Sequence, residues 1–267
     1  MSNAPNKQTS GTLVFVTWVV LLFLLLPLLV IVPVSFTPHR YLSLPGDTWS
    51  LRHYQALVSD PGWRSSAVDS LIVAVGASAI ATVLGASCAI GCWRISTRLS
   101  ESIRLLMLAP IIVPSIVHAL GFSRAWVEFG LYNSYLGLIL AHAMKGIPYV
   151  VICVSAALTN FDLRLEQAAR NLGATGGQAI RRVVLPSIMP GVVAGAGLAF
   201  FTSWDELVVN LFIVSRGVVT LPRKIWISIQ DNIDPAVAAV ATLLTMVTLV
   251  VIIAHIARMR RAGGLDQ

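Results

Sequence analysis

Three ionisable side chains lie where the surrounding sequence is otherwise apolar. Asp205 and Glu206 interrupt an apolar run at about 187–214, and Lys145 stands within another at about 137–158. An ionised side chain at the centre of a bilayer costs about 2.5–3.5 kcal/mol on insertion scales, so such residues face a water-filled cavity or a partner. If these runs cross a membrane, the three residues predict a polar path through it.

The two acids favour a path for a cationic solute. Trp204 precedes them and would offer an aromatic face for a cation–π contact. Adjacent residues of a helix point about 100° apart, so Asp205 and Glu206 are not expected to serve equally. One of them could instead cap a broken helix or pair internally. Trp204, Asp205, Glu206 and Lys145 are therefore the candidate residues of a substrate path.

The sequence leaves three roles open for Lys145. Its ammonium could neutralise Asp205 or Glu206, which would weaken the argument for a cationic solute. It could instead bind the carboxylate of a zwitterionic solute, such as an amino acid or an opine-like conjugate. Its long side chain could also reach an interface, as lysines near helix ends do.

The elements that must position these residues are membrane-spanning helices. Of 267 residues, 56% are hydrophobic and only 12% are charged, whereas soluble domains carry about 25% charged residues. The mean hydropathy is +0.80. A helix needs about 20 apolar residues to cross a bilayer. We therefore expect an all-α polytopic membrane protein, a single domain over 1–267, with six transmembrane helices at about 13–36, 67–93, 103–122, 137–158, 187–214 and 236–257.

Two local features add detail to this pattern of six apolar runs. The third run contains Pro110 and Pro114, which a membrane helix tolerates because neighbouring groups satisfy the freed carbonyls. The polar stretch after the first run contains Leu51–Val58, which predicts a short interfacial helix.

Basic residues indicate an orientation and not a nucleic-acid site. The net charge is +7, but the basic residues lie between apolar runs, so we expect contact with membrane lipid and none with nucleic acid. If both termini are cytoplasmic, eleven Lys and Arg fall on the cytoplasmic side and seven on the opposite side. This excess follows the positive-inside rule and makes the loop at 159–186 cytoplasmic.

The first half of this loop predicts a short amphipathic helix. Asp162 is a favourable N-cap for a helix that begins near Leu163. Gly173 stands where a left-handed residue would end it. Its apolar residues recur at helical spacing and must be buried against a partner; they are Leu165, Ala168, Ala169 and Leu172.

The second half predicts another helix. Thr175 and Gln178 have the spacing of a capping box. The helix would continue to about Val184 and stop before Pro186, because a proline disfavours helical backbone at the preceding residue.

This loop resembles the EAA loop of bacterial ABC importer permeases. That motif reads Glu-Ala-Ala, three residues, Gly, nine residues, Ile, any residue, Leu-Pro. Gln167-Ala168-Ala169, Gly173 and Val183-Val184-Leu185-Pro186 match its spacing at every step. Gln167 replaces the motif's Glu and Val183 replaces its Ile. Glu166, one position earlier, could supply the acid on a different helix face.

The resemblance implies that the loop is a coupling helix, which docks in a cleft of a separate ATP-hydrolysing subunit. The expected docking residues are Leu165, Glu166, Gln167, Ala168, Ala169, Gly173, Ala174, Leu185 and Pro186. A Gly173→Trp substitution should then uncouple transport without preventing membrane insertion. Normal uptake by this variant would contradict the coupling-helix interpretation.

The resemblance extends over about 12–257, and three segments look like permeases assigned to spermidine and putrescine uptake, of the second-permease type. These segments are 203–209, 220–226 and 234–239. The resemblance implies a bacterial inner-membrane complex with a second homologous permease, two copies of a cytoplasmic ATPase subunit and a periplasmic substrate-binding protein. ATP and Mg²⁺ would bind the ATPase subunit, and no cofactor is expected on this chain.

We expect that the chain is not an enzyme itself but a pore subunit, with ATP hydrolysis in a separate subunit. The glycines at 173–177 are not followed by the lysine of a phosphate-binding loop, and no Gly-x-Ser-x-Gly or His-Glu-x-x-His segment occurs. No metal site is expected. A self-contained secondary transporter or channel remains an alternative of a different class, as does a membrane-embedded enzyme, although we find no cluster of catalytic residues for the latter.

Overall fold

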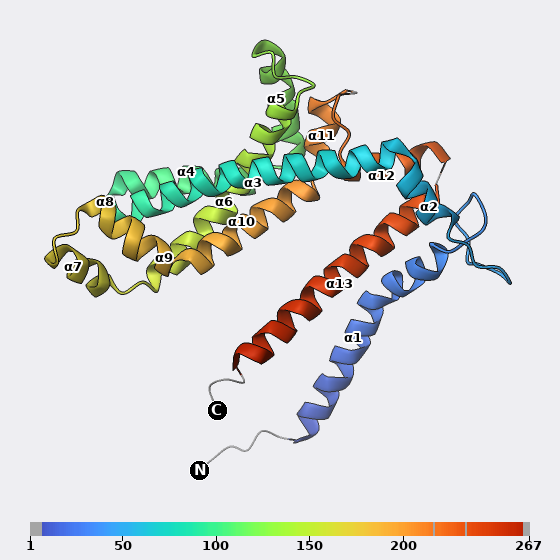
Figure 1. The fold of residues 1–267 in the computed structure, drawn as a ribbon, viewed down its shortest axis with the longest axis horizontal. Coiled ribbons are helices and arrows are strands. Elements are labelled where there is room, and N and C mark those ends of the chain that lie inside the picture. The colour runs from blue at the N-terminus through green and yellow to red at the C-terminus, as the bar shows by residue number, and fades with distance from the viewer. Residues whose placement is uncertain (1–6, 216, 233, 264–267) are drawn as a thin grey trace. The chain divides into compact units, whose positions relative to one another are not determined.

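The computed structural model describes residues 7–215, 217–232 and 234–263, and this part of the chain contains helices and no strand. The predicted all-α class is therefore confirmed. The contacts within the chain divide it into two compact units, Ser65–Lys224 and Met1–Arg64 with Ile225–Gln267. Figure 1 shows the order of the helices along the chain, and each unit is described by itself.

Among the described residues, four helices are long and apolar enough to cross a membrane. Two bent helix pairs also qualify if each pair is taken as one span, which raises the number to six. The four helices are α1 (Lys7–Val34), α3 (Pro61–Ile95), α6 (Tyr135–Thr159) and α13 (Ala236–Gly263).

The predicted run at 103–122 is bent. It consists of α4 (Arg98–Ile112) and α5 (Ser115–Glu128), which meet at an angle of 103°. Pro110 lies inside α4, whereas Val113 has extended backbone and Pro114 precedes the first residue of α5. A proline favours extended backbone at the residue before it, so Pro114 accounts for the break at Val113.

The predicted run at 187–214 is divided twice. The helical segment Gly176–Ser187 meets α10 (Met189–Trp204) at an angle of 70°. The helix α10 then ends one residue before Asp205, and a short helix, α11 (Val208–Ile213), follows after the two acids. The acids therefore lie in a break between helices and not inside a continuous one.

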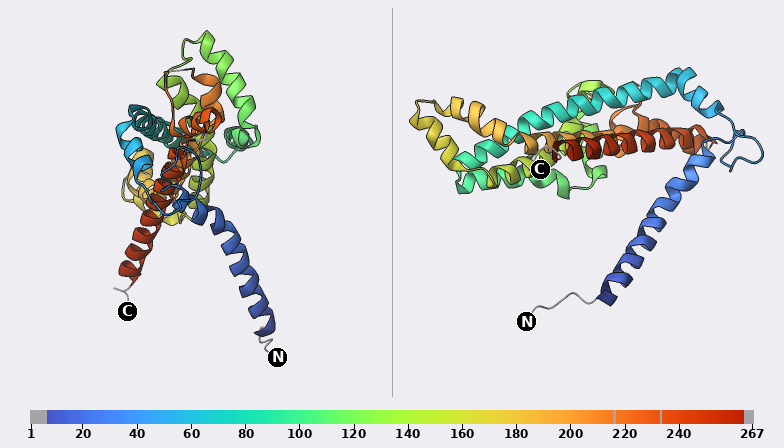
Figure 2. Two further views of the ribbon diagram at one scale, coloured as in Figure 1. Left: turned by 90° about the vertical axis from the view of Figure 1, so that its right-hand side faces the viewer. Right: turned by 60° about the horizontal axis from the view of Figure 1, so that its bottom comes forward.

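The core of the unit Ser65–Lys224 forms where α6 packs on α10. A Cβ atom added at Gly195 would lie 2.8 Å from the Cα atom of Val150, and one at Gly191 would lie 2.6 Å from the Cβ atom of Ala157. Only glycine allows this approach, as is common where membrane helices pack closely. The three views of Figures 1 and 2 show α6 and α10 running alongside each other.

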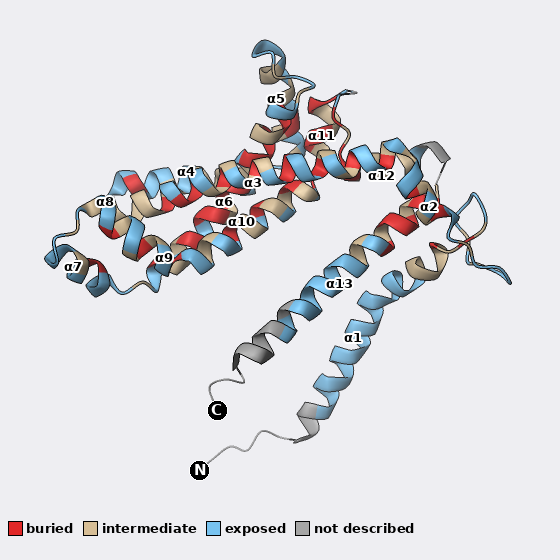
Figure 3. Ribbon diagram, in the orientation of Figure 1, coloured by how far each residue is buried: buried red, intermediate tan, exposed pale blue. Residues whose placement is uncertain are grey.

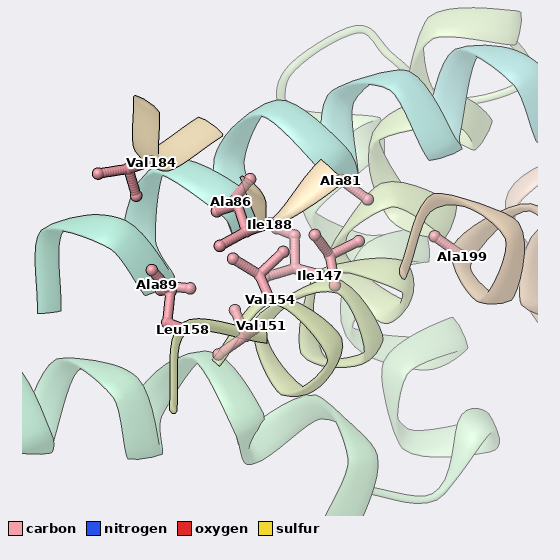
Figure 4. Packing of buried hydrophobic residues seen from close by; sticks show 11 residues of the cluster. Ala81, Ala86, Ala89, Ile147, Val151, Val154, Leu158, Val184, Ile188 and Ala199 are labelled. Atoms are coloured by element: carbon pink, nitrogen blue, oxygen red, sulfur yellow. The ribbon is translucent and has the colours of Figure 1, made fainter. Parts of the chain in front are cut away.

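A cluster of buried apolar side chains joins α3, α6 and α10 (Figure 4). Ala81, Ala86 and Ala89 of α3 contact it, and α6 contributes Val150, Val154 and their neighbours. Val184 and Ile188 extend it to the segment that precedes α10. The core therefore connects the helices that carry the candidate polar path with the loop at 159–186.

The other unit contains α1, α13 and α2 (Arg52–Ser59), and α13 contacts both of the others. The helix α2 confirms the short helix predicted at Leu51–Val58. Residues 11–30 of α1, most of which are apolar, are exposed, and Figure 3 colours this part of the helix accordingly. A helix that is apolar and exposed in this way is suited to lipid or to a partner subunit.

The helix α12 (Leu221–Asn232) was not anticipated from the sequence. Its polar residues obscured a helical pattern. Pro222 near its start was the available signal, because proline is favoured in the first turn of a helix.

Candidate functional site

Lys145 and Glu206 form an ion pair inside the unit Ser65–Lys224. Lys145 extends from α6, and Glu206 lies in the break between α10 and α11. Their side chains are 12% and 8% exposed. The Lys145 Nζ atom also donates a hydrogen bond of 2.8 Å to the Oγ atom of Ser115, at the start of α5. Of the three roles left open for Lys145, the structure shows neutralisation of an acid.

Glu206 also determines where α11 begins. Its Oε1 atom accepts a hydrogen bond of 3.0 Å from the backbone N–H of Val209, in the first turn of α11. A carboxylate at a helix N-terminus satisfies a free N–H group and interacts favourably with the helix dipole. Glu206 thus holds α6 and α11 together while it breaks the apolar run.

A second polar contact lies one turn away from this pair. The Nδ1 atom of His142 and the Oγ atom of Ser203 share a hydrogen bond of 2.8 Å, and both residues are buried. His142 and Lys145 are three residues apart on α6, so they lie on the same side of that helix. Sequence reasoning missed Ser115, His142 and Ser203, because isolated hydroxyl and imidazole groups in apolar runs give no signal of their partners.

Asp205 differs from its neighbour Glu206. It is exposed, and none of the ion pairs found among the described residues includes its carboxylate. Its backbone N–H closes the last turn of α10 by donating to the carbonyl of Phe201. The ring of Trp204 stacks on that of Phe200, with centroids 5.8 Å apart. Of the two neighbouring acids, Asp205 is therefore the one that is exposed.

The predicted start and end of the first loop helix are both confirmed. The helix α7 (Leu163–Asn171) begins after Asp162, whose Oδ1 atom accepts a hydrogen bond of 2.9 Å from the backbone N–H of Arg164. Gly173 follows the helix with a φ of +90°, a value that disfavours any other residue.

The second loop helix begins as predicted and ends differently. Thr175 and Gln178 form the capping box at the start of α8 (Gly176–Ala179). The helix does not stop before Pro186, which is a correction to the prediction. A π-helical turn at Ile180–Val184 carries the chain into α9 (Leu185–Ser187). The wider turn gives the Pro186 ring room that a regular α-helix lacks.

Most of the expected docking residues are accessible in the structure. Leu165, Gln167, Ala168, Gly173 and Pro186 are exposed. Ala169, Ala174 and Leu185 are half-buried.

Glu166 is the exception among the expected docking residues. It is buried, and its Oε1 atom contacts Arg94 at 2.7 Å and Arg170 at 3.0 Å. The exposed polar side chain at this point of the motif is therefore Gln167.

Comparison with known proteins identifies the family. Residues 81–261 match the family described as binding-protein-dependent transport system inner membrane component. The chain belongs to this family. It is therefore an inner-membrane, multi-pass component of a transport system, and the predicted membership of this permease family is confirmed.

Several relatives are transport permeases. The spermidine/putrescine transport system permease protein PotC of Haemophilus influenzae is 30% identical over 223 residues, which cover 83% of this chain and 86% of that protein. The putrescine transport system permease protein PotI of Escherichia coli is 30% identical, over 81% of this chain and 79% of that protein. The molybdenum transport system permease protein ModB of Mycobacterium bovis is 32% identical, over 69% of this chain and 76% of that protein.

Two solved structures share the fold. A chain of a bacterial ABC transporter involved in the import of the acidic polysaccharide alginate matches 97% of this chain and 98% of that chain, with a TM-score of 0.72 and 13% identity. A chain of an amino acid ABC transporter matches 78% of this chain and 98% of that chain, with a TM-score of 0.56 and 19% identity. At these identities, the two matches support the permease fold and say nothing about the solute.

Proposed function

We propose that this chain is a transmembrane subunit of an ATP-driven importer that carries a polyamine, such as spermidine or putrescine, across the bacterial inner membrane. The observation that carries the proposal is the similarity to PotC over 83% of the chain. The ModB relative is named for molybdenum transport, so membership of the family does not define the solute. The charges of the candidate path must supply that part of the argument.

The charges of the path favour a cation. The ion pair of Lys145 and Glu206 neutralises two of the three membrane charges, and the exposed Asp205 carboxylate remains. Trp204 adjoins it and offers an aromatic face to an ammonium group. A zwitterionic solute would need a cation for its own carboxylate, and the ammonium of Lys145 is already bound to Glu206 and Ser115.

The partners of the proposal follow from the loop at 159–186. Its exposed residues Leu165, Gln167 and Ala168 would dock on a cytoplasmic ATPase subunit, present in two copies, which binds ATP and Mg²⁺. A second, homologous permease would complete the pore, and a periplasmic binding protein would deliver the solute. Both termini of this chain would be cytoplasmic, in agreement with the distribution of Lys and Arg.

Substitution of Asp205 tests the cation path. We expect Asp205→Asn to lower uptake of radiolabelled putrescine or spermidine by about tenfold or more, because a hydrogen bond to a charged group contributes about 1.5–3 kcal/mol. Asp205→Glu retains the charge and should retain much of the uptake. The amount of assembled complex in the membrane, measured by co-purification of the ATPase subunit, should be equal in all three proteins. Unchanged polyamine uptake by Asp205→Asn would contradict the assignment of this acid.

A further inference from the structure

The cytoplasmic loop is attached to α3 by an ion pair that joins residues far apart in the sequence. The Nη2 atom of Arg94, in the last turn of α3, donates a hydrogen bond of 2.7 Å to the Oε1 atom of Glu166 on α7. Arg170, one turn further along α7, contacts the same oxygen at 3.0 Å. Both guanidinium groups therefore converge on one carboxylate. Arg170 belongs to α7 itself, whereas Arg94 belongs to α3 and so connects the two helices.

Two neighbouring contacts support this attachment. The ring of Trp93 meets the ring of Phe161 edge to face, with centroids 6.0 Å apart, just before α7 begins. On the other side, Gly176 at the start of α8 lies beside the guanidinium groups of Arg94 and Arg170, since a Cβ atom added there would be 3.5 and 3.6 Å from their Nη2 atoms. The end of α3 thus contacts the loop before, within and after α7.

The ion pair between Arg94 and Glu166 is more buried than the one between Arg170 and Glu166. The side chain of Glu166 is 10% exposed and that of Arg94 is 28% exposed, whereas Arg170 is 48% exposed. Of the two pairs on this carboxylate, the one with Arg94 is the more buried, and an exposed pair within one helix contributes little. Arg94 should therefore hold Glu166 much more firmly than Arg170 does.

We propose that Arg94 and Glu166 form a tether through which a movement of α7 is passed to α3. Glu166 is then a positioning residue that acts inside the chain, and the neighbouring Gln167, which is exposed, is available to a partner. The inference rests on the proposed function, because it takes α7 to be the element that the ATPase subunit moves. It differs from the docking role expected for Glu166, in which the carboxylate would face that subunit.

Arg94 and Arg170 provide a matched pair of variants. Arg94→Met and Arg170→Met each remove one guanidinium group from the same carboxylate oxygen, and each leaves a side chain of similar length. Only the first variant breaks the link between α7 and α3. In proteoliposomes that contain the whole complex with loaded binding protein, the quantity to compare is the number of solute molecules transported per ATP hydrolysed.

We expect Arg94→Met to lower this ratio by about tenfold, and Arg170→Met to change it by less than about twofold. In the Arg170→Met background, the charge exchange Arg94→Glu with Glu166→Arg should restore much of the ratio, because it forms the same ion pair with the two charges exchanged and leaves no second arginine beside position 166. The ATPase subunit should still co-purify with the Arg94→Met complex. Equal losses in the two arginine variants, or loss of the ATPase subunit in Arg94→Met alone, would overturn the tether.

Hydrogen exchange gives a readout that does not depend on transport. In the purified full-length chain, Arg94→Met should speed amide exchange in residues 163–171 relative to wild type, and Arg170→Met should do so much less. If the wild-type complex neither binds an ATPase subunit nor transports, the proposed function fails, while the exchange data still decide whether Arg94 holds α7. Identical exchange in wild type and Arg94→Met would overturn the tether even in a complex that transports.

Discussion

At the scale of single residues, the neighbouring acids Asp205 and Glu206 have different surroundings. Glu206 is buried, paired with Lys145 and bound to the first turn of α11, whereas Asp205 is exposed. The first arrangement stabilises the break between α10 and α11. The second would leave one negative charge for a solute, as we propose.

The buried ion pair of Lys145 and Glu206 predicts how single and double substitutions change the free energy of unfolding. Lys145→Met leaves the carboxylate of Glu206 buried without its partner, and loss of one partner of a buried pair costs about 3–5 kcal/mol. The double variant Lys145→Met with Glu206→Gln carries no unpaired charge, and the amide oxygen can still accept from the N–H of Val209. We therefore expect the single variant to lower the free energy of unfolding in detergent micelles, measured by denaturant titration, and the double variant to recover most of it. A single variant as stable as wild type would show that the ion pair does not hold α6 to the break.

The sequence could indicate these residues but could not divide the roles among them. Apolar surroundings were enough to single out Lys145, Asp205 and Glu206. The choice between the two acids depends on which one faces α6, and that follows from the backbone of the break. Ser115 and His142 could not be found for the same reason, because their partners lie 30 and 61 residues away in the chain.

At the scale of elements, the close approach of α6 and α10 depends on glycines at the contact. Gly191 and Gly195 face α6 at distances that exclude a side chain, whereas a Cβ atom added at Gly197 would meet nothing within 4 Å. These positions lie on the same helix, so helix propensity affects Gly195 and Gly197 alike.

The two glycines therefore make a controlled comparison. Gly195→Ala should destabilise the protein, since extra volume in a packed contact costs about 1–3 kcal/mol. Gly197→Ala should be neutral or should stabilise the helix by up to about 1 kcal/mol, because alanine is the better helix former. The melting temperature of each variant in detergent measures both effects. A lower melting temperature for Gly197→Ala than for Gly195→Ala would contradict the proposed packing.

Capping signals predicted the ends of elements better than hydropathy did. Asp162, Gly173 and the Thr175–Gln178 capping box were each recognised from local chemistry, and the structure has them where they were expected. The bends were not recognised, because a hydropathy pattern does not change where Pro114 breaks a helix. The π-helical turn before Pro186 was missed because it depends on a hydrogen-bond register that residue types do not specify.

At the scale of the whole molecule, composition was sufficient for the fold class, and a loop motif was sufficient for the family. Low charge and long apolar runs predicted an all-α membrane protein, which the structure and the family confirm. Six runs were predicted, and the described helices supply four spans, or six with the bent pairs. The assignment of 1–267 to a single domain and the inner position of both termini stay predictions.

The proposed partner subunits would cover apolar surfaces that this chain exposes. Apolar residues are exposed along α1 and along the C-terminal half of the described part of α13, which Figure 3 colours as exposed. Leu165 and Ala168 of α7 are exposed as well. The membrane and the second permease would cover the former surfaces, and the ATPase subunit would cover the latter. Experiments that identify the solute should therefore use the assembled importer and not this chain alone.

The most direct test of this account is the ATPase activity of the co-expressed complex in lipid, with its binding protein and candidate solutes. We predict that binding protein loaded with spermidine or putrescine stimulates hydrolysis, and that unloaded protein does so much less. Stimulation by an amino acid or another zwitterion alone would retain the importer class and contradict the polyamine assignment. A chain that co-purifies with no ATPase subunit and transports unaided would contradict the central claim and favour a self-contained transporter.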